Sequence, residues 1–207
     1  MIFLTIITIF NLLSLFHYIY ACPVSCLCDE PDKLATCNSE QLDSVPKNFP
    51  WFVQEILLQD NNIKILNKQT FPSRQNLAKV SFKNNRIETV AEQAFVDNKN
   101  LKALIFSENN LSKIPTKSLE KCKNLVELHL DHNKLKALGV NSFTQLSDLE
   151  WLNLSNNQIK QISGDSFRGL NRLKYLNLEN NLMRAIGAVT LSHLNRLLSL
   201  DISNNQL

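Results

Sequence analysis

One motif recurs every 24 residues from Val53 to the end of the chain, and it limits the folds open to this sequence. The stretch 148–159, DLEWLNLSNNQI, contains the motif as L-x-x-L-x-L-x-x-N-x-I, starting at its second residue. The first residue of each copy is Val53, Leu77, Leu101, Leu125, Leu149, Leu173 or Leu197. Because one unit of this length is too small to bury a core alone, successive units must stack into a solenoid.

Within each repeat the leucines alternate as a β-strand requires. Leu152 and Leu154 are two residues apart, so both point to one face of a strand, while Trp151 points to the other. Strands stacked about 4.8 Å apart form a parallel sheet with a continuous leucine core. Two more apolar columns follow, at the fourteenth repeat position (Leu66, Val90, Ile114, Leu138, Ile162, Ile186) and the nineteenth (Phe71, Phe95, Leu119, Phe143, Phe167, Leu191). The predicted fold is an α/β solenoid shaped like a horseshoe. A parallel sheet forms its concave face, and mostly loops and short 3-10 or helical turns form its convex face.

A polar column accompanies the leucines at the ninth repeat position. It consists of Asn61, Asn85, Asn109, Asn133, Asn157, Asn181 and Asn205. A buried amide needs hydrogen-bond partners for both its donor and its acceptor group. Where the chain turns out of the strand, such side chains can bond backbone groups that the turn leaves unpaired. We therefore interpret the column as a structural ladder rather than as a row of ligand-binding amides.

Residues 1–21 predict a secretory signal peptide. They contain no Asp, Glu, Lys or Arg, the run 2–16 is mostly apolar, and the segment ends at the small residue Ala21. An uncleaved signal anchor is the alternative, but the apolar run is short for a bilayer span and is interrupted by Asn11. A bacterial lipoprotein signal is disfavoured because the next residue, Cys22, has another use.

Four cysteines follow within sixteen residues, Cys22, Cys26, Cys28 and Cys37. Directly after a secretory signal, such a cluster indicates disulfides, which persist in oxidising compartments. A zinc site is the alternative, disfavoured by the predicted secretion and by the missing histidine motif. Four cysteines allow three pairings, and their spacing does not decide among them.

The cysteine cluster also carries a resemblance to a known family. CPVSCLC with Cys37, followed by LDSVPKNFP at 42–50, resembles the cysteine-rich amino-terminal cap and half repeat of extracellular leucine-rich-repeat proteins, among them Slit, Toll-like and adhesion receptors. The resemblance covers residues 22–207 and implies the disulfides Cys22–Cys28 and Cys26–Cys37. The expected organisation is a signal peptide at 1–21, a cap with a half repeat at 22–52, and seven repeats at 53–207, the last incomplete.

The cap has a physical purpose. The first coil would otherwise expose its leucine core and an unpaired strand edge to water, which invites aggregation. Residues 33–37 are predicted to supply a short covering strand held by the bridges.

A fifth cysteine, Cys122, lies at the twenty-second position of its repeat, where later repeats have leucine. We predict a small buried hydrophobic residue, since unpaired cysteine is among the most buried residue types. An intermolecular disulfide is the alternative for an odd cysteine in a secreted chain.

The sequence stops at Leu207, the eleventh position of the seventh repeat, without a second cysteine cluster. Ending there would leave the last core exposed, so we expect a fragment of a longer protein. Membrane attachment is expected only through sequence beyond residue 207.

The charge pattern excludes a nucleic-acid footprint. The net charge is +3, and no basic stripe with interleaved aromatics appears. The informative surface is the predicted concave face, made by the third, fifth and seventh residues of each repeat. Coil by coil these are Glu55, Leu57, Gln59; Lys79, Ser81, Lys83; Ala103, Ile105, Ser107; Glu127, His129, Asp131; Trp151, Asn153, Ser155; Tyr175, Asn177, Glu179; and Ser199, Asp201, Ser203. The face carries five acids and two lysines, and both lysines lie in the second coil, so coils four to seven form an acidic field.

Trp151 and Tyr175 hold the same position on adjacent coils and therefore lie on neighbouring strands. Exposed aromatic pairs are common binding hot spots, whereas the alternative is simple lateral packing on the sheet. We expect a protein ligand with basic residues, and no nucleic acid, to dock here. The predicted contact residues are Glu127, His129, Asp131, Trp151, Tyr175 and Glu179.

Two Asn-x-Ser sequons occur, at Asn110 and Asn153. Glycans suit exposed loops of secreted proteins, which favours Asn110 beside its turn. Asn153 projects from the concave face next to Trp151, so a glycan there would shield the aromatic pair.

No catalytic, metal or cofactor site is predicted. His129, Asp131 and His132 lie together, and Ser155 lies one coil from Asp131. A Ser-His-Asp relay or a metal centre needs a pocket of fixed geometry, which an open sheet does not provide. His132 is expected to point away by strand alternation. The chain has no Gly-rich phosphate loop and no C-x-x-C spacing.

Three functions fit these features. The first is a secreted or cell-surface recognition module, for adhesion, guidance or reception, that binds a protein ligand on a rigid concave face. The second, implied by resemblance to peroxidasin-like proteins, is the targeting arm of a larger secreted enzyme, in which the repeats themselves are not an enzyme. The third, implied by resemblance to Toll-like proteins, is the ectodomain of an innate-immune pattern-recognition receptor.

Overall fold

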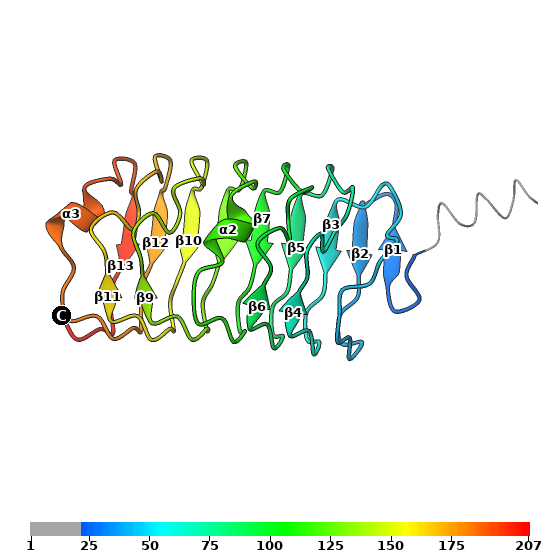
Figure 1. Ribbon diagram of the computed structural model, residues 1–207, viewed down its shortest axis with the longest axis horizontal. Coiled ribbons are helices and arrows are strands. Elements are labelled where there is room, and N and C mark those ends of the chain that lie inside the picture. Colours follow the sequence, from blue (N-terminus) through cyan, green and yellow to red (C-terminus); the bar gives the residue numbers. More distant parts are fainter. Residues whose placement is uncertain (1–21) are drawn as a thin grey trace, which may run out of the picture.

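The computed structural model describes residues 22–207, and the predicted signal peptide lies outside these residues. The chain winds into coils that stack along one axis, and each coil adds a strand to the same sheet (Figure 1). The predicted fold class, a leucine-rich-repeat solenoid with a parallel sheet and little helix, is confirmed.

The main sheet has nine strands in the order β1-β2-β3-β5-β7-β8-β10-β12-β13. These are Leu27–Asp29 (β1), Leu34–Thr36 (β2), Glu55–Leu57 (β3), Lys79–Ser81 (β5), Ala103–Ile105 (β7), Glu127–His129 (β8), Trp151–Asn153 (β10), Tyr175–Asn177 (β12) and Ser199–Asp201 (β13). All neighbours pair in parallel except β1 and β2, which are antiparallel. The register keeps equivalent repeat positions opposite one another, as Leu128, Leu152 and Leu176 show.

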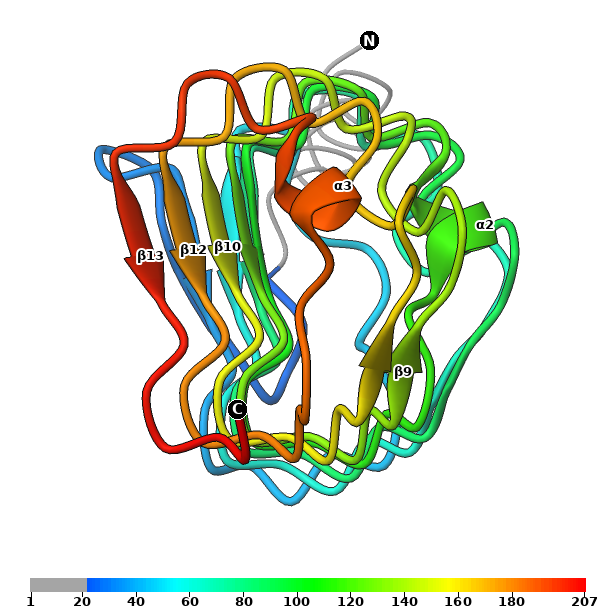
Figure 2. The same cartoon turned by 90° about the vertical axis from the view of Figure 1, so that its left-hand side faces the viewer.

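The other side of the coils carries little regular structure. Two pairs of short strands form there, Ile65–Leu66 (β4) with Thr89–Val90 (β6) and Ala137–Leu138 (β9) with Gln161–Ile162 (β11), together with the one-turn helices Thr116–Leu119 (α2) and Ala188–Leu191 (α3). Figure 2, seen along the stacking axis, shows β10, β12 and β13 of the main sheet on one side and β9 and α2 on the opposite side. We call the outer surface of the nine-stranded sheet, the predicted concave face, the sheet face.

The core fills the space between these two sides. From the strands it receives the fourth and sixth residues of each repeat, and Leu128, Leu130, Leu152 and Leu154 are fully buried. From the opposite side come large aromatic rings such as Phe143 and Phe167, whose centroids are 6.2 Å apart. Burying one such side chain contributes about 1.5–3 kcal/mol to the free energy of folding. Because every coil buries several of them against its neighbours, each added coil stabilises the stack.

The asparagines of the ninth repeat position bond the backbone of two successive coils. Asn133 donates through Nδ2 to the carbonyls of Leu130 (3.2 Å), Asp131 (3.0 Å) and Phe106 of the preceding coil (2.8 Å). Its Oδ1 accepts the backbone N–H of Leu111 at 2.9 Å. Equivalent contacts recur at Asn61, Asn85, Asn109, Asn157, Asn181 and Asn205. Each side chain thereby ties its own turn to the coil before it.

The residue before each ladder asparagine adopts a left-handed backbone conformation. These eighth-position residues, Asp60, Asn84, Glu108, His132, Asn156, Asn180 and Asn204, have φ between 52° and 58°. Asn and Asp tolerate this region better than other non-glycine residues, which explains their frequency at this position. The turn ends the strand and places the next side chain inside the coil.

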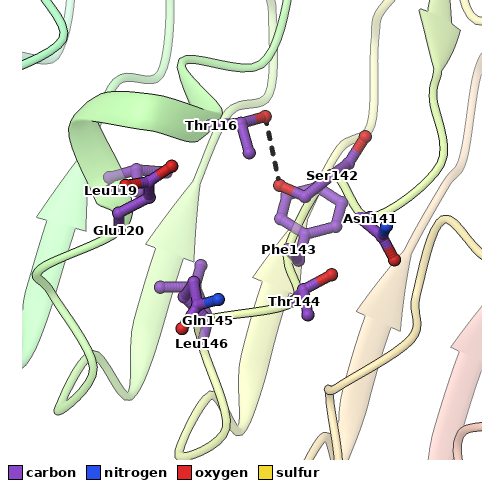
Figure 3. Close-up of a pocket in the computed structure, with 9 residues that line it drawn as sticks. All are labelled: Thr116, Leu119, Glu120, Asn141, Ser142, Phe143, Thr144, Gln145 and Leu146. Atoms are coloured by element: carbon purple, nitrogen blue, oxygen red, sulfur yellow. Dashed lines mark hydrogen bonds between the residues drawn. The ribbon is translucent and has the colours of Figure 1, made fainter.

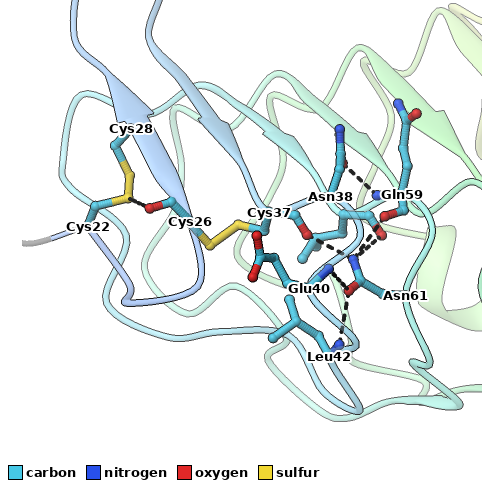
Figure 4. Close-up of a disulfide and its surroundings, with 10 residues drawn as sticks. Cys22, Cys26, Cys28, Cys37, Asn38, Glu40, Leu42, Gln59 and Asn61 are labelled. Carbon is cyan, nitrogen blue, oxygen red and sulfur yellow. Dashed lines mark hydrogen bonds between the residues drawn. A yellow bond between two sulfur atoms is a disulfide. The ribbon is translucent and has the colours of Figure 1, made fainter.

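The amino-terminal cap closes one end of the core (Figure 4). The disulfides join Cys22 to Cys28 and Cys26 to Cys37, which is the pairing that the family resemblance implies. Strand β2 pairs in parallel with β3 and so covers the edge of the repeats. The carbonyl of Cys37 accepts a hydrogen bond from Asn61 Nδ2 at 2.8 Å, so the cap joins the asparagine ladder.

Cys122 is free and fully buried within the core. Burial raises the pKa of its thiol to about 12, since the apolar surroundings disfavour the thiolate. A thiol that is buried and protonated neither reacts readily nor reaches a partner chain, so Cys122 acts as a small apolar core residue.

Candidate functional site

Three rings lie together on the sheet face at β8, β10 and β12. Trp151 and Tyr175 are register partners, and their ring centroids are 4.7 Å apart with planes at 34°. The imidazole of His129 stacks on the other side of Trp151, with centroids 6.5 Å apart and planes at 26°. Trp151 is 43% exposed and Tyr175 38%, so both rings remain open to a partner. We call these three residues the aromatic row.

Carboxylates border the aromatic row. Glu127 is the register partner of Trp151, and its Oε2 lies 4.0 Å from Nε2 of His129. Asp131 lies 4.0 Å from the other ring nitrogen, Nδ1. Desolvation lowers the pKa of His129, and the attraction of Asp131 and Glu127 opposes this shift without cancelling it. The imidazole is therefore neutral at physiological pH, and the two carboxylates keep their negative field.

The acids predicted for coils four to seven are Glu127, Asp131, Glu179 and Asp201. Within residues 22–207, none of them lies within ion-pair distance of a lysine or arginine. Hydrogen bonds from the side chain and the backbone N–H of Ser203 lower the pKa of Asp201. By contrast, Lys79 is paired with Glu55 at 3.5 Å. The acidic field therefore has no internal countercharge from lysine or arginine.

Asp131 and Glu179 are less available than the sequence suggests. The Asp131 side chain is only 13% exposed, since its carboxylate accepts hydrogen bonds from Ser107 Oγ at 2.7 Å and pairs with His132 Nδ1 at 3.1 Å. Glu179 is half-buried and accepts a hydrogen bond from Asn204 at 3.1 Å. Asp131 therefore positions its neighbours, whereas Glu127, with a side chain 53% exposed, is open to a partner.

Two expectations about the sheet face were wrong. The third, fifth and seventh residues of each repeat were predicted to form this surface, but four of them are buried, because their small side chains lie between larger neighbours on adjacent coils. These are Ser81, Ala103, Ser107 and Ser155. His132 does not point away from Asp131, because β8 ends at His129 and His132 lies in the left-handed turn, where strand alternation no longer applies. The relay considered for Ser155 is not formed either, since Asp131 bonds Ser107 instead.

The two sequons lie in different settings. Asn110 lies in the loop after its turn, half-buried, and its backbone N–H donates to the carbonyl of Ile87 at 2.9 Å. Asn153 lies within β10, and its Oδ1 accepts the backbone N–H of Ser155 at 3.1 Å. The Asn153 carboxamide is therefore held against the strand end.

The opposite side offers a hollow between α2 and the turn at 141–146 (Figure 3). It has a volume of about 240 Å³, and the hydroxyl of Thr116 donates across it to the carbonyl of Ser142 at 3.3 Å. Its one titratable side chain among the lining residues is that of Glu120. The hydroxyls of Thr116 and Ser142 donate to backbone carbonyls rather than to Glu120, so the lining residues do not form a hydrogen-bonded pair of nucleophile and base.

Residues 22–207 contain no group of three or more His, Cys, Asp or Glu side chains placed to hold a metal ion. Over the same residues, no helix is long and apolar enough to span a bilayer. The sheet face with its aromatic row remains the candidate site.

Sequence reasoning identified the neighbours Trp151 and Tyr175 but missed that His129 extends them. His129 is at the fifth repeat position and Trp151 at the third, so their contact runs diagonally across two strands. Such a contact depends on the side-chain rotamers, which periodicity does not determine.

Comparison with known protein families identifies the repeats. The family model for the leucine rich repeat matches residues 53–111, 75–135, 99–159, 123–183 and 152–207. The chain is also 31% identical over 62 residues to the chondroadherin-like protein of Mus musculus, a stretch that covers 30% of this chain and 8% of that protein. The chain thus corresponds to a small part of that relative's length.

Proposed function

Since the chain belongs to the leucine-rich repeat family, we propose that it recognises a protein ligand outside the cell with its sheet face. Repeats of this family usually form binding modules rather than enzymes. The disulfide-bonded cap supports an extracellular site of action, because such bridges persist in oxidising compartments.

The observation that carries this proposal is the exposed aromatic row beside an uncompensated carboxylate. Because the rings of the row stack on one another, the stem of a ligand lysine or arginine would pack along the exposed edges of Trp151 and Tyr175, with its charge near Glu127. Long cationic side chains bury their apolar stems in this way, and paired aromatics at an interface centre dominate many binding energies. The ligand is therefore a protein that presents basic side chains.

Rigidity adds to the affinity. The strands that carry the row are fixed on both sides by neighbouring coils and beneath by the asparagine ladder. Little backbone entropy is lost when a ligand docks on such a surface. We therefore propose that the sheet face binds its ligand through preorganised contacts, in a role such as adhesion, guidance or reception.

The proposal requires Asn153 to carry no glycan, since a glycan there would cover Trp151. We place glycosylation, where it occurs, on Asn110 in its loop.

This proposal is tested by measuring binding to an array of extracellular receptor and matrix domains. The unaltered chain is compared with its Trp151→Ala, Tyr175→Ala double variant. We expect the double variant to bind the partner at least about a hundredfold more weakly, on the order of 3 kcal/mol, because it removes the aromatic surface against which the basic side chains pack.

Trp51→Ala is the matched control. Trp51 is 61% exposed but lies in the segment before the first repeat motif, outside the sheet face. This variant should bind as the unaltered chain does. Equal affinity of the double variant and the unaltered chain for the recovered partner would place the binding surface elsewhere.

A further inference from the structure

A second charged surface lies away from the sheet face, along the edge that follows the asparagine ladder. In coils three to six this edge consists of residues 109–116, 133–140, 157–164 and 181–188. These segments contain no Asp or Glu, and their cations are Lys113, Lys134, Lys136, Lys160 and Arg184. We call these five residues the basic edge. The strands β9 and β11 mark its position at the lower border of the molecule in Figure 1.

The basic edge is free of countercharges within the described residues. All five side chains are exposed, and none of them forms an ion pair within residues 22–207. Some lysines elsewhere on the molecule are neutralised, since Lys117 pairs with Glu92 at 2.6 Å and Lys174 with Glu150 at 2.7 Å. The positive field of the basic edge is thus available to a partner.

The cations form a row because the coils are in register. Lys136 and Lys160 immediately precede β9 and β11, which pair in parallel, and the backbone N–H of Lys160 donates to the Lys136 carbonyl at 3.0 Å. Arg184 follows on the next coil at the same repeat position. Adjacent positions are therefore separated by about one strand spacing, roughly 4.8 Å.

A hollow lies at the end of this row. It has a volume of about 620 Å³, and Lys160 and Arg184 line it together with Gln161 and Gln206. The guanidinium of Arg184 donates through Nε to Oε1 of Gln206 at 3.4 Å, which holds it beside the hollow. Cationic groups next to carboxamides can bind sulfate oxygens and sugar hydroxyls within one site.

We propose that the basic edge binds a linear sulfated polysaccharide that runs across coils three to six. The inference rests on the extracellular location proposed above, and it is independent of the ligand of the sheet face. The even spacing of Lys136, Lys160 and Arg184 matches a polymer with regularly spaced anions, and each contact releases a counterion. The polysaccharide and the protein ligand occupy different surfaces, so the chain can hold both at once.

Other polyanions fit the edge less well. Its four segments contain no Phe, Tyr or Trp on which nucleic-acid bases would stack. Val140 is the one large apolar residue of these segments that is strongly exposed, so the edge lacks the apolar face with which a protein would enter an anionic membrane.

The proposal is tested by measuring binding to immobilised heparin and to phosphatidylserine vesicles across a series of salt concentrations. N-glycans are first removed enzymatically from the chain, because Asn110 lies on the same edge and a glycan there would cover it. The test variant is Lys136→Gln, Lys160→Gln, Arg184→Gln. We expect the chain to bind heparin and not the vesicles. The variant should bind heparin about tenfold more weakly or worse, and the slope of log affinity against log salt should fall by roughly two.

The matched control is Lys99→Gln, Lys102→Gln, Lys123→Gln. It removes the same charge from exposed lysines on the opposite edge, which carry no ion pair within residues 22–207. It should retain most heparin affinity, and so should the Trp151→Ala, Tyr175→Ala variant. Absence of heparin binding, an equal loss in the control, or a preference for vesicles would overturn the proposal. An unchanged circular dichroism melting curve shows that a variant is folded.

Discussion

Replacing Asn133 with leucine is expected to lower the free energy of unfolding by roughly 3–5 kcal/mol. Leucine has a similar size but neither donates nor accepts hydrogen bonds. The backbone N–H of Leu111 loses its partner, and the carbonyls of Leu130 and Asp131 each lose a donor. Because the site is buried and water cannot replace these bonds, two successive coils are weakened by one substitution.

Equilibrium unfolding in urea measures this effect, and Asn76→Leu provides the control. Asn76 is exposed and makes no side-chain hydrogen bond among the described residues, so its replacement should change the unfolding free energy by no more than about 0.5 kcal/mol. If Asn133→Leu unfolded at the same urea concentration as the unaltered chain, the ladder would not be a structural device.

The second large effect is expected from opening the Cys26–Cys37 disulfide by replacing both cysteines with serine. The loss should be about 2–5 kcal/mol, the usual cost of removing a native bridge from a secreted domain. Cys37 is fully buried, and its carbonyl accepts the bond from Asn61, so the bridge holds β2 against the first complete coil. Without it, the edge of β3 becomes available to other chains.

Calorimetry and size-exclusion chromatography measure both consequences, as a lower melting temperature and a larger aggregated fraction. The control opens Cys22–Cys28 in the same way. That bridge spans 6 residues rather than 11, and its cysteines are half-buried, so its loss should cost less. A melting temperature that falls equally in both variants, or in neither, would contradict the special role of Cys37.

The solenoid was predictable because one repeated pattern determines strand direction, register and core at once. Leu152 can pair with Leu128 and Leu176 in only one register if all three are to be buried. The asparagine column was predictable for a similar reason, since seven identical polar residues beside a buried row need a common set of backbone partners.

The details of the sheet face were harder to predict. The burial of Ser155 and the diagonal stacking of His129 on Trp151 depend on neighbouring side chains and rotamers, which a 24-residue period does not contain. The contact of His132 with Asp131 depends on the left-handed turn. The frequent Asn and Asp at the eighth position carried a signal for that turn, because these residues favour such a conformation.

Hydroxyl-radical footprinting of the chain, alone and with the partner recovered from the domain array, tests the central claim most directly. The oxidation rate of Trp151 and Tyr175 should fall several-fold on binding, while that of the more exposed Trp51 stays unchanged within the same sample. Protection of Trp51 with continued oxidation of Trp151 and Tyr175 would show that the sheet face is not the surface this protein uses.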